Sequence, residues 1–415
     1  GTKMRFVIEN PPFGTPWGGK DAAEGVEQAV NDEYTKGFDG RWGAGLPGSG
    51  DMQMLFLQSA IDKMDDNFGR AAIIENGSPL FSGGTASGES QIRRWMLEND
   101  LIEAIIALPT DLFYNTGIAT YIWVLSKNKR RERKGKIQLI DASGICHKLR
   151  KPLGSKKNEF TPEDREVITK LYCDFEENEF SKIYNNTEFI YREYTVMQPL
   201  QRRYEITDES IERLMQSGVL SKLYDEAKVL ELEEKGENMT AKERTKLEDF
   251  KKSKQQYDSI INALNAAKSE EKYMSPEAFL PVINKVLPDV DSKLVDKIAD
   301  ALSVMDKNAE IQREKKGKNK GEIIYDKDTK DTEIVKYDED IEDYMAREVL
   351  PHITDAKWFF EENLAAKKPV IKTGAEIPFT RCFYKYQKQA ASEDIAAKMA
   401  RLVKEAGEIE ARLFG

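Results

Sequence analysis

The sequence predicts an α/β fold in which a Rossmann-like sheet, parallel with an antiparallel edge, is followed by a mainly helical C-terminal region. Over roughly the first 145 residues, short apolar runs alternate with segments of helical periodicity, as in a doubly wound sheet. The last of these runs follow one another without helices between them, which favours an antiparallel edge. Beyond residue 200 the chain is highly charged and its apolar residues take helical spacing.

The first part of the chain supplies two predicted strands and the helix between them. The run Arg5-Phe6-Val7-Ile8 indicates a buried strand, and a polar, Gly-rich segment from Gly14 to Gly50 separates it from a helix at Asp51–Met64. Asp51 suits the N-cap of that helix. Arg70–Glu75 is the next buried strand. Because the chain opens almost directly on a strand, we expect a truncated N-terminus.

The rest of the sheet follows a loop rich in Gly and Ser, Ser82–Gly88, which leads into a helix at Glu89–Asn99. Three further strands are predicted at Leu101–Leu108, Thr120–Ser126 and Lys136–Asp141. Since no helical pattern separates the last strands, we expect them to complete the sheet as its antiparallel edge.

The C-terminal part is predicted to be mainly helical. Lys222–Lys235 and Ala241–Ala267 indicate two long helices, joined at Gly236-Glu237-Asn238 as a helical hairpin. The charged stretches 317–321 and 326–332 are typical of solvated linkers.

These elements divide the chain into five segments. They are residues 1–145 with the sheet, 146–205 as a basic connecting segment, 206–310 as a helical region, 311–335 as a charged linker and 336–415 as a C-terminal region. The last segment ends in an amphipathic helix, Glu393–Leu413, whose apolar residues have near-heptad spacing. Such a stripe pairs with another helix, either of the same chain or of a partner.

Composition limits the function. Charged residues make up 33% of the sequence and the net charge is -10, so any nucleic-acid contact must come from a local patch. Three separated cysteines and two histidines predict no metal site, and reduced thiols in a cytoplasmic protein. We expect neither a signal peptide nor membrane contact, because no apolar run approaches membrane-spanning length.

The most informative motif is Asn10-Pro11-Pro12-Phe13, which follows the first strand at its C-terminal end, where open α/β sheets bind ligands. The Asn10 side-chain carbonyl and the Pro11 backbone carbonyl can each accept a hydrogen bond from an exocyclic amino group. The prolines stiffen the loop, and Phe13 offers a ring face to a flipped base. The same residues also suit a plain turn that ends a strand, so other segments must decide.

Two further segments fit a nucleic-acid enzyme. The loop after Leu108 carries Phe113 and Tyr114, which either cap the core or supply a second wall opposite Phe13. The segment from Lys127 to Lys157 is strongly basic within an acidic chain, and it is either a phosphate contact or a solvated loop. The candidates for DNA binding are Lys129, Arg130, Arg131, Arg133 and Lys134.

A cofactor of nucleotide type needs a Gly-rich turn after the first strand of the sheet and an acidic residue for its ribose. The pairs Gly43-x-Gly45 and Gly48-x-Gly50 follow no predicted strand, and Gly83-Gly84 lacks the spacing. We therefore expect loop glycines here and identify no cofactor-binding residues.

Together these segments resemble the modification (methyltransferase) subunit of Type I restriction-modification systems, an adenine-N6 DNA methyltransferase. The matching pieces occur in the family's order across most of the chain. They are Asn10–Phe13, Asn76–Phe81, Glu89–Trp95, Glu103–Pro109, Phe113–Thr120, Ile140–Ala142, Arg347–His352 and Ile377–Arg381.

The resemblance implies that residues 1–145 are the C-terminal half of a methyltransferase sheet. Carried over by position, Asn10, Pro11 and Pro12 hold the target amine, Phe13 stacks on the flipped adenine, and Phe113 is the second aromatic wall. It also implies direct methyl transfer from S-adenosylmethionine to N6, without a covalent enzyme intermediate.

The implied partners are DNA and a specificity subunit, on whose helical spacer the C-terminal helices dock, and the restriction subunit is a further candidate. The recognised DNA sequence is chosen by another polypeptide in this family.

The family's glycine motif and helical N-terminal region come before the Asn-Pro-Pro-Phe loop, and this sequence contains neither. We therefore expect a C-terminal fragment that binds S-adenosylmethionine poorly and does not methylate by itself. Two other functions stay open: an RNA or protein-glutamine amino-methyltransferase, which can use a similar loop, and a non-catalytic scaffold that binds a specificity subunit.

Overall fold

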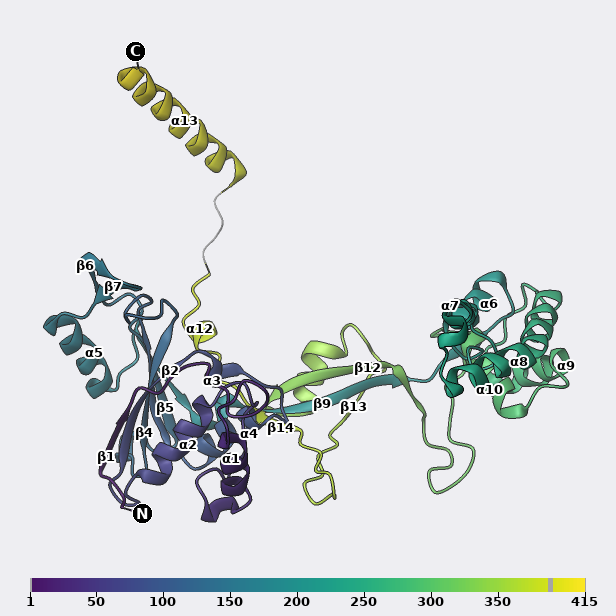
Figure 1. The fold of residues 1–415 in the computed structure, drawn as a ribbon, viewed down its shortest axis with the longest axis horizontal. Helices are drawn as coiled ribbons and strands as arrows, with labels where there is room; N and C mark the ends of the chain where they lie inside the picture. The colour runs from purple at the N-terminus through teal and green to yellow at the C-terminus, as the bar shows by residue number, and fades with distance from the viewer. Residues whose placement is uncertain (1, 387–390, 415) are drawn as a thin grey trace. The chain divides into compact units, whose positions relative to one another are not determined.

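The computed structural model describes residues 2–386 and 391–414 (Figure 1). The chain divides into two compact units. Unit 1 comprises Gly1–Glu193, Ile334–Asp338 and Glu362–Gly415, and unit 2 comprises Tyr194–Glu333 and Glu339–Glu361. Each unit has its own hydrophobic core. The division into five segments expected from the sequence stays a prediction.

Unit 1 is built on a six-stranded sheet with the order β1-β2-β4-β3-β5-β8. Its strands are β1 Phe6–Glu9, β2 Arg70–Asn76, β3 Ile102–Leu108, β4 Thr120–Ser126, β5 Lys136–Asp141 and β8 Ser181–Asn185. β1, β2, β3 and β5 run in one direction, and β4 and β8 run opposite to their neighbours. This confirms the predicted α/β class with a mostly parallel sheet.

The antiparallel strands differ in position from the expectation. β8 is an edge strand, but β4, which we expected at the edge, lies between β2 and β3. β4 pairs antiparallel with both neighbours, since a connection without a helix turns the chain straight back along β3. β5, also expected in the antiparallel edge, is parallel to β3.

Helices cover both faces of the sheet. They are α1 Val26–Tyr34, α2 Gln53–Lys63, α3 Ser78–Phe81, α4 Gly88–Glu98 and α5 Pro162–Asp174. On one face, Leu57 of α2 and Met96 of α4 are buried in a core that includes Ile105 of β3. On the other face, Ile106 of β3 packs in a cluster with Leu171 of α5. Because strand side chains alternate between faces, β3 is buried on both sides.

Two elements of unit 1 were not predicted. Helix α1 lies within the Gly-rich segment and buries Val30 against Trp17 and Trp42. Strands β6 His147–Leu153 and β7 Lys156–Glu159 form a two-stranded antiparallel hairpin inside the expected basic connecting segment.

Arg93 of α4 fastens a late segment of the chain to the sheet domain. Its side chain is fully buried, and its guanidinium donates hydrogen bonds to the backbone carbonyls of Ala375 (2.8 Å), Pro79 (3.1 Å) and Ser82 (2.8 Å). Burial lowers the pKa of Arg93 to about 10, so the guanidinium stays charged at neutral pH. One side chain thereby joins the turn at Pro79–Ser82 to Ala375, which is almost 300 residues later in the sequence.

The segment held by Arg93 is β14, Thr373–Ala375, which pairs antiparallel with the start of β9, Ile190–Pro199. The backbone N–H of Ala375 donates to the Ser90 hydroxyl at 2.9 Å. A Cβ at Gly374 would lie 2.7 Å from that hydroxyl oxygen, so β14 can approach α4 this closely only with glycine at this position.

Unit 2 contains the helical region. Its helices are α6 Asp208–Gln216, α7 Glu226–Lys235, α8 Ala241–Ala266, α9 Pro276–Val286 and α10 Ser292–Leu302. The predicted helical hairpin is confirmed as α7 and α8, joined at Gly236–Asn238. Leu214, Phe279 and Ile298 are fully buried in the core. β10 Arg202–Tyr204 pairs antiparallel with β11 Ser303–Met305.

A second sheet has the order β12-β9-β13, with β14 also paired to β9. β12 is Tyr325–Lys336 and β13 is Lys357–Phe359. The linker predicted at residues 326–332 is therefore wrong. Backbone hydrogen bonds to β9 hold this mostly exposed, charged strand, and its side chains carry little of the usual apolar alternation. Residues 317–321 lie outside any helix or strand and are exposed, as expected.

The remaining elements are α11 Ile341–Tyr344 with a π-helical turn at Met345–Val349, α12 Phe379–Cys382 and α13 Ser392–Phe414. Helix α13 confirms the final helix predicted at Glu393–Leu413. Its apolar side chains remain exposed.

We expect Arg93→Met to destabilise unit 1 by about 3 kcal/mol, because three carbonyls lose their charged donor and two of these hydrogen bonds are buried. Urea denaturation of the two proteins measures the difference. Arg401→Met is the matched control: Arg401 lies on α13 with 68% of its side chain exposed, and its replacement should change the unfolding free energy by less than about 0.5 kcal/mol. Equal losses in the two variants would contradict the role given to Arg93.

Candidate functional site

The four parallel strands β1, β2, β3 and β5 end at the same edge of the sheet, which we call the carboxyl edge. The loop Asn10–Phe13 leaves β1 there, and Asn76 and Gly77 end β2 beside it. The loop Thr110–Thr116 follows β3 at the same edge. Ligands of open α/β sheets bind at such an edge.

Asn10-Pro11-Pro12-Phe13 lies directly after β1, as the sequence predicted. Asn10 and Pro12 are exposed, Pro11 is buried and Phe13 is half-buried. Gly14 follows in the left-handed region with φ of +62°, which glycine adopts without strain. The loop thus presents the Asn10 amide to solvent while the buried proline holds its backbone in place. The roles of the four residues toward a base stay a prediction.

The Gly-rich segment beside this loop is fixed by two tryptophans. The Trp17 indole donates to the Gly48 carbonyl at 3.1 Å, and the Trp42 indole donates to the Leu55 carbonyl of α2 at 3.1 Å. Both rings belong to a small buried cluster. The segment is therefore packed structure and not an open loop.

The glycines of this segment serve close packing. The Gly48 N–H donates to the Glu89 carboxylate at 2.6 Å, and the Gly45 carbonyl accepts from the Gln58 amide at 3.0 Å. A Cβ at Gly88, the first residue of α4, would lie 1.6 Å from the Leu46 carbonyl oxygen. One glycine of each pair is thus engaged with α2 or α4, and the interpretation of the pairs as loop glycines stays a prediction.

Helix α2 also orients the loop after β2. The Asn76 N–H donates to the Gln53 side-chain oxygen at 2.8 Å, and the Gln53 amide in turn donates to Asp51. The Asn76 side-chain oxygen accepts from the Ser78 N–H at 2.8 Å. This chain of hydrogen bonds fixes the backbone next to the Asn10 loop.

Glu75 is a buried carboxyl group at the carboxyl edge. Its side chain is 0% exposed, and neither carboxyl oxygen has a hydrogen-bond partner among the residues that the structure describes. Burial, and then the nearby carboxyl groups of Asp51 and Glu9, raise the pKa of Glu75 to about 9. It is therefore uncharged at neutral pH. Partial burial also raises the pKa of Glu9, the residue before Asn10.

The two aromatics of the loop after β3 have different surroundings. Phe113 is partly buried against an apolar cluster that contains Leu108 and Ile140. Tyr114 is 61% exposed, and the ammonium group of Lys156 lies 5.6 Å from its ring centre. The sequence named Phe113 as the second wall of the base pocket. The structure adds Tyr114 as the more accessible ring, and the choice between them stays a prediction.

The structure buries Lys129 and Arg133, which the sequence named as DNA-binding residues, and this does not favour that prediction. Lys129 is 3% exposed, and its ammonium group donates to the Asp100 carboxylate and the Lys136 carbonyl. Arg133 is 4% exposed and donates to Gln138 at 3.0 Å. Both cations are engaged inside the chain, because buried charges need partners.

Arg130, Arg131 and Lys134 are exposed, so DNA contact by these three stays a prediction. Their position does not favour it. They lie between the end of β4 and the start of β5, and β4 runs opposite to the parallel strands. The loop is therefore at the edge of the sheet opposite the carboxyl edge.

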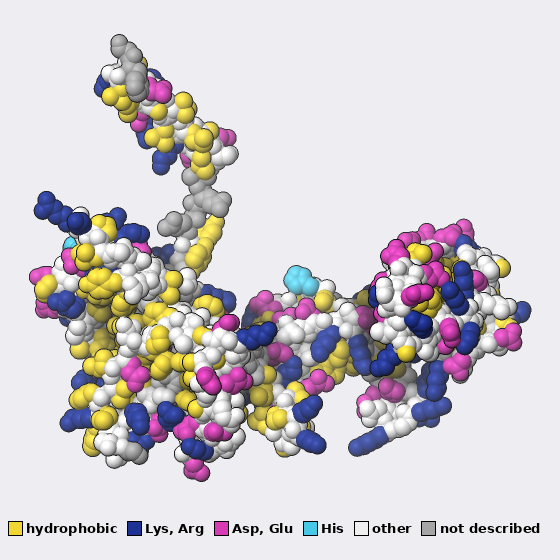
Figure 2. Space-filling model, in the orientation of Figure 1, with side chains coloured by type: hydrophobic (Ala, Val, Ile, Leu, Met, Phe, Trp, Pro, Cys, Tyr) yellow, Lys and Arg dark blue, Asp and Glu magenta, His cyan; other side chains and the backbone are white. Residues whose placement is uncertain are grey.

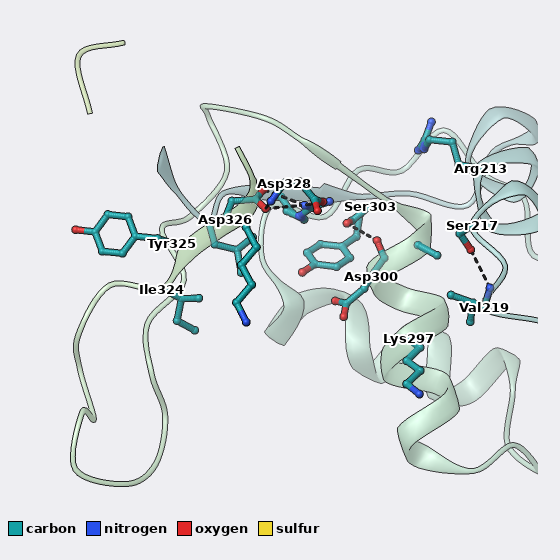
Figure 3. Close-up of a pocket in the computed structure, with 15 residues that line it drawn as sticks. Arg213, Ser217, Val219, Lys297, Asp300, Ser303, Ile324, Tyr325, Asp326 and Asp328 are labelled. Carbon is teal, nitrogen blue, oxygen red and sulfur yellow. Dashed lines mark hydrogen bonds and ion pairs between the residues drawn. The ribbon is translucent and has the colours of Figure 1, made fainter. Parts of the chain in front are cut away.

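Unit 2 contains a cavity of about 640 Å³ between β10, α6, α10 and the start of β12 (Figure 3). Arg202 in its wall forms ion pairs with Asp326 at 2.9 Å and with Asp328. Asp300 also lines it, and burial raises the pKa of that carboxyl. Because the two carboxylates neutralise Arg202, this guanidinium is not free to bind an anionic ligand. No site residue predicted from the sequence lines this cavity.

Within residues 2–386 and 391–414, no group of three or more His, Cys, Asp and Glu side chains is arranged to hold a metal ion. In the same residues, no helix combines the length and apolar character needed to cross a membrane.

Comparison with known proteins relates the chain to DNA-modifying enzymes. The sequence model of the family described as N-6 DNA Methylase matches residues 1–210. The MjaVIII Type I restriction enzyme methylase subunit of Methanocaldococcus jannaschii is 30% identical over 225 residues, which are 54% of this chain and 36% of that protein. The HindI methylase subunit of Haemophilus influenzae is 33% identical over 144 residues, 34% of this chain and 28% of that protein. The chain thus spans about a third of the length of these relatives.

Among solved structures, the methyltransferase subunit of a type I restriction-modification system from Streptococcus thermophilus is similar in part. The similar part covers 45% of this chain and 36% of the Streptococcus thermophilus chain. The sequence identity is 26% and the TM-score is 0.37.

The raised pKa of Glu75 makes stability depend on pH. The folded chain keeps a proton that the unfolded chain releases above about pH 4.5, so stability should fall as the pH rises toward 9. Between pH 5.5 and 7.5 the loss should be up to about 2–3 kcal/mol. In Glu75→Gln, which cannot ionise, this fall should be absent. Urea denaturation across this range measures both slopes.

The matched control for Glu75 is Glu166→Gln, since Glu166 is exposed on α5. This variant should keep the pH dependence of the unsubstituted protein. If Glu75→Gln also kept it, Glu75 would not be the buried acid responsible.

Proposed function

The chain belongs to the N-6 DNA methylase family, and we propose that it is the part of an adenine-N6 DNA methyltransferase subunit that holds the target base. One observation carries the proposal: Asn10-Pro11-Pro12-Phe13 lies at the carboxyl end of β1, with Asn10 exposed and Phe13 half-buried. An exposed amide beside an accessible ring face suits an extruded adenine. The enzyme would act within a Type I restriction-modification complex.

The proposed chemistry at this loop concerns the amino group of the base. Its two N–H bonds would donate to the Asn10 side-chain oxygen and the Pro11 carbonyl. Hydrogen bonds to both acceptors favour a pyramidal nitrogen, so its lone pair is less delocalised into the ring and becomes a better nucleophile. Phe13 would hold the ring by stacking. Since Pro11 is buried and proline fixes its φ angle, the acceptors need little reorganisation when the base arrives.

S-adenosylmethionine is the methyl donor that we propose for the complete enzyme, to which it supplies an activated methyl group. The glycine pairs between residues 43 and 50 do not offer a cradle for its nucleotide, because one glycine of each pair is hydrogen-bonded to α2 or α4. We therefore assign this chain's residues only to the base. β1 is an outer strand that exposes Phe6 by 66% and Ile8 by 85%. The Asn10 loop follows this strand directly, so a protein segment packed on Phe6 and Ile8 would lie next to the loop. A methyl donor that reacts with a base held by Asn10 must bind in the same place.

The other two functions suggested by the sequence are less well supported. An RNA or protein-glutamine methyltransferase could use the same loop chemistry, but the family matched by the chain is one of DNA methylases. A purely scaffolding role leaves the exposed Asn10 amide at the carboxyl edge without a purpose.

We further propose that α13 binds a helix of the DNA-specificity subunit. Its apolar stripe is exposed along its whole length. The members are Ile395 (50%), Met399 (62%), Leu402 (51%), Val403 (70%), Ile409 (57%) and Leu413 (70%). A stripe at near-heptad spacing is stabilised by burial against a second helix, and the polar remainder of α13 suits an interface rim.

In the full-length enzyme, Asn10→Ala should lower the rate of adenine-N6 methylation at least about 100-fold, because one of two preorganised acceptors is removed. Incorporation of labelled methyl groups into DNA measures this rate. Asn10→Asp keeps an oxygen at the same position and should retain more activity than Asn10→Ala. A fully active Asn10→Ala enzyme with normal DNA binding would remove the central claim.

The double variant Met399→Glu, Leu402→Glu should weaken binding of the specificity subunit about 100-fold or more, since it would bury unpaired charge in the interface. Co-purification and calorimetry with that subunit measure the effect. Lys404→Glu, on the opposite face of α13, is the control and should bind normally. Normal assembly of the double variant would show that α13 does not form this contact.

A further inference from the structure

The β6–β7 hairpin is a basic element at the carboxyl edge to which no function is assigned. It follows β5, whose carboxyl end lies at that edge. Figure 2 shows Lys and Arg side chains gathered over its tip. The hairpin carries Lys148, Arg150, Lys151, Lys156 and Lys157, with Glu159 as its one acidic residue. In a chain of net charge -10, this local excess of positive charge is pronounced.

Three of these cations are free to bind an external anion. Lys148, Arg150 and Lys151 are exposed, and within the described residues no carboxylate forms an ion pair with any of them. The other two contact the chain itself: Lys157 pairs with Asp111 at 3.2 Å, and the Lys156 ammonium group donates to the Leu112 carbonyl at 3.1 Å. The strand β6 therefore carries the unpaired charge, and β7 anchors it.

The anchoring is a network of backbone hydrogen bonds to the loop after β3. The Asp111 carbonyl accepts from the N–H groups of Lys157 (2.8 Å) and Asn158 (3.0 Å). The Tyr114 carbonyl accepts from the Ser155 N–H at 3.0 Å, and the Asn158 amide donates to the Thr110 carbonyl at 2.8 Å. These hydrogen bonds hold the hairpin in a fixed position relative to the loop that carries Tyr114.

The backbone of this loop is itself unusual. Asp111 has a φ of +55°, which non-glycine residues adopt at some cost. A Cβ at Gly117 would lie 2.6 Å from the Asp111 side chain. The Asp111 carbonyl nevertheless accepts from two N–H groups of β7, and these hydrogen bonds offset the cost of its backbone conformation.

The hairpin lies within reach of a duplex whose extruded base occupies the Asn10 loop. Four strand spacings separate β1 from β5 in the sheet, which is about 19 Å or roughly six base pairs of DNA. Lys148, Arg150 and Lys151 are all exposed on β6, whose register with β7 shifts between Lys148 and Leu153. Phosphates flanking the extruded nucleotide would meet these side chains.

We propose that the β6–β7 hairpin binds the phosphate backbone of the substrate DNA, with Lys148, Arg150 and Lys151 as its contacts. This inference rests on the proposed function. The hairpin positions the duplex relative to the Asn10 and Tyr114 loops and reads no bases, because phosphate contacts carry orientation and not sequence. Its three unpaired cations lie at the carboxyl edge, whereas Arg130, Arg131 and Lys134 lie at the opposite edge.

The test uses the full-length enzyme and a fluorescent 30-base-pair duplex of arbitrary sequence, with binding measured against salt concentration. The variant Lys148→Ala, Arg150→Ala, Lys151→Ala should bind about tenfold more weakly at low salt. Its slope of log affinity against log salt should fall by about 3, one unit for each phosphate that the variant no longer neutralises. The charge-conserving variant Lys148→Arg, Arg150→Lys, Lys151→Arg should restore most of the slope, which a merely structural role would not predict.

The matched control is Arg130→Ala, Arg131→Ala, Lys134→Ala, which removes equal charge at the opposite edge and should bind as the unsubstituted enzyme does. An unchanged slope in the hairpin variant overturns the proposal, and so does an equal decrease in both variants. Weakened assembly with another subunit at an unchanged DNA slope also overturns it, since the partner is then an acidic protein surface.

Methylation of genomic DNA with labelled S-adenosylmethionine separates this proposal from the proposed function. An unsubstituted enzyme that binds DNA but transfers no methyl group contradicts the function alone. If it methylates adenine while the hairpin variant keeps its salt slope, the function stands and the hairpin proposal fails.

Discussion

The arrangement of the site depends on strand direction. β1, β2, β3 and β5 are parallel, so the segments that follow them emerge at one edge although they lie up to about 140 residues apart in the chain. The Asn10 loop, the Asn76 turn, the Tyr114 loop and the β6–β7 hairpin all meet there for this reason. β4 pairs antiparallel with both β2 and β3, so it returns the chain to the opposite edge of the sheet. The residues between β4 and β5 therefore lie away from the site.

Buried ionisable groups secure this scaffold in three different ways. Arg93 keeps its charge and donates to three backbone carbonyls. Lys129 keeps its charge by pairing with Asp100. Glu75 has no partner among the described residues, and its raised pKa leaves it neutral. The difference follows from the cost of an isolated buried charge, which a protein avoids either by pairing it or by shifting its protonation.

Much of the sheet could be predicted from the sequence. Apolar runs located β2, β3, β4 and β5 to within about two residues, and the position of Asn10–Phe13 after a strand was correct. Pairing order could not be predicted, because periodicity reports which residues are buried and not which strands are neighbours. β12 was missed since backbone pairing holds it and its side chains are mostly exposed. The β6–β7 hairpin had a local signal, the turn Gly154-Ser155 between two short runs, but its high charge hid it.

The basic segment shows most directly why composition was insufficient for the site. Residues 129–134 and 148–157 are similarly rich in Lys and Arg, and they differ in what the fold places beside them. Asp100 and Glu103 border the first group and bind Lys129 and Arg133, whereas Lys148 and Arg150 extend from a strand with no carboxylate paired to them among the described residues. A cation becomes available to phosphate only where the chain leaves it unneutralised. Strand pairing, which places the first segment opposite the carboxyl edge and the second at that edge, therefore distinguishes two segments that local charge density does not.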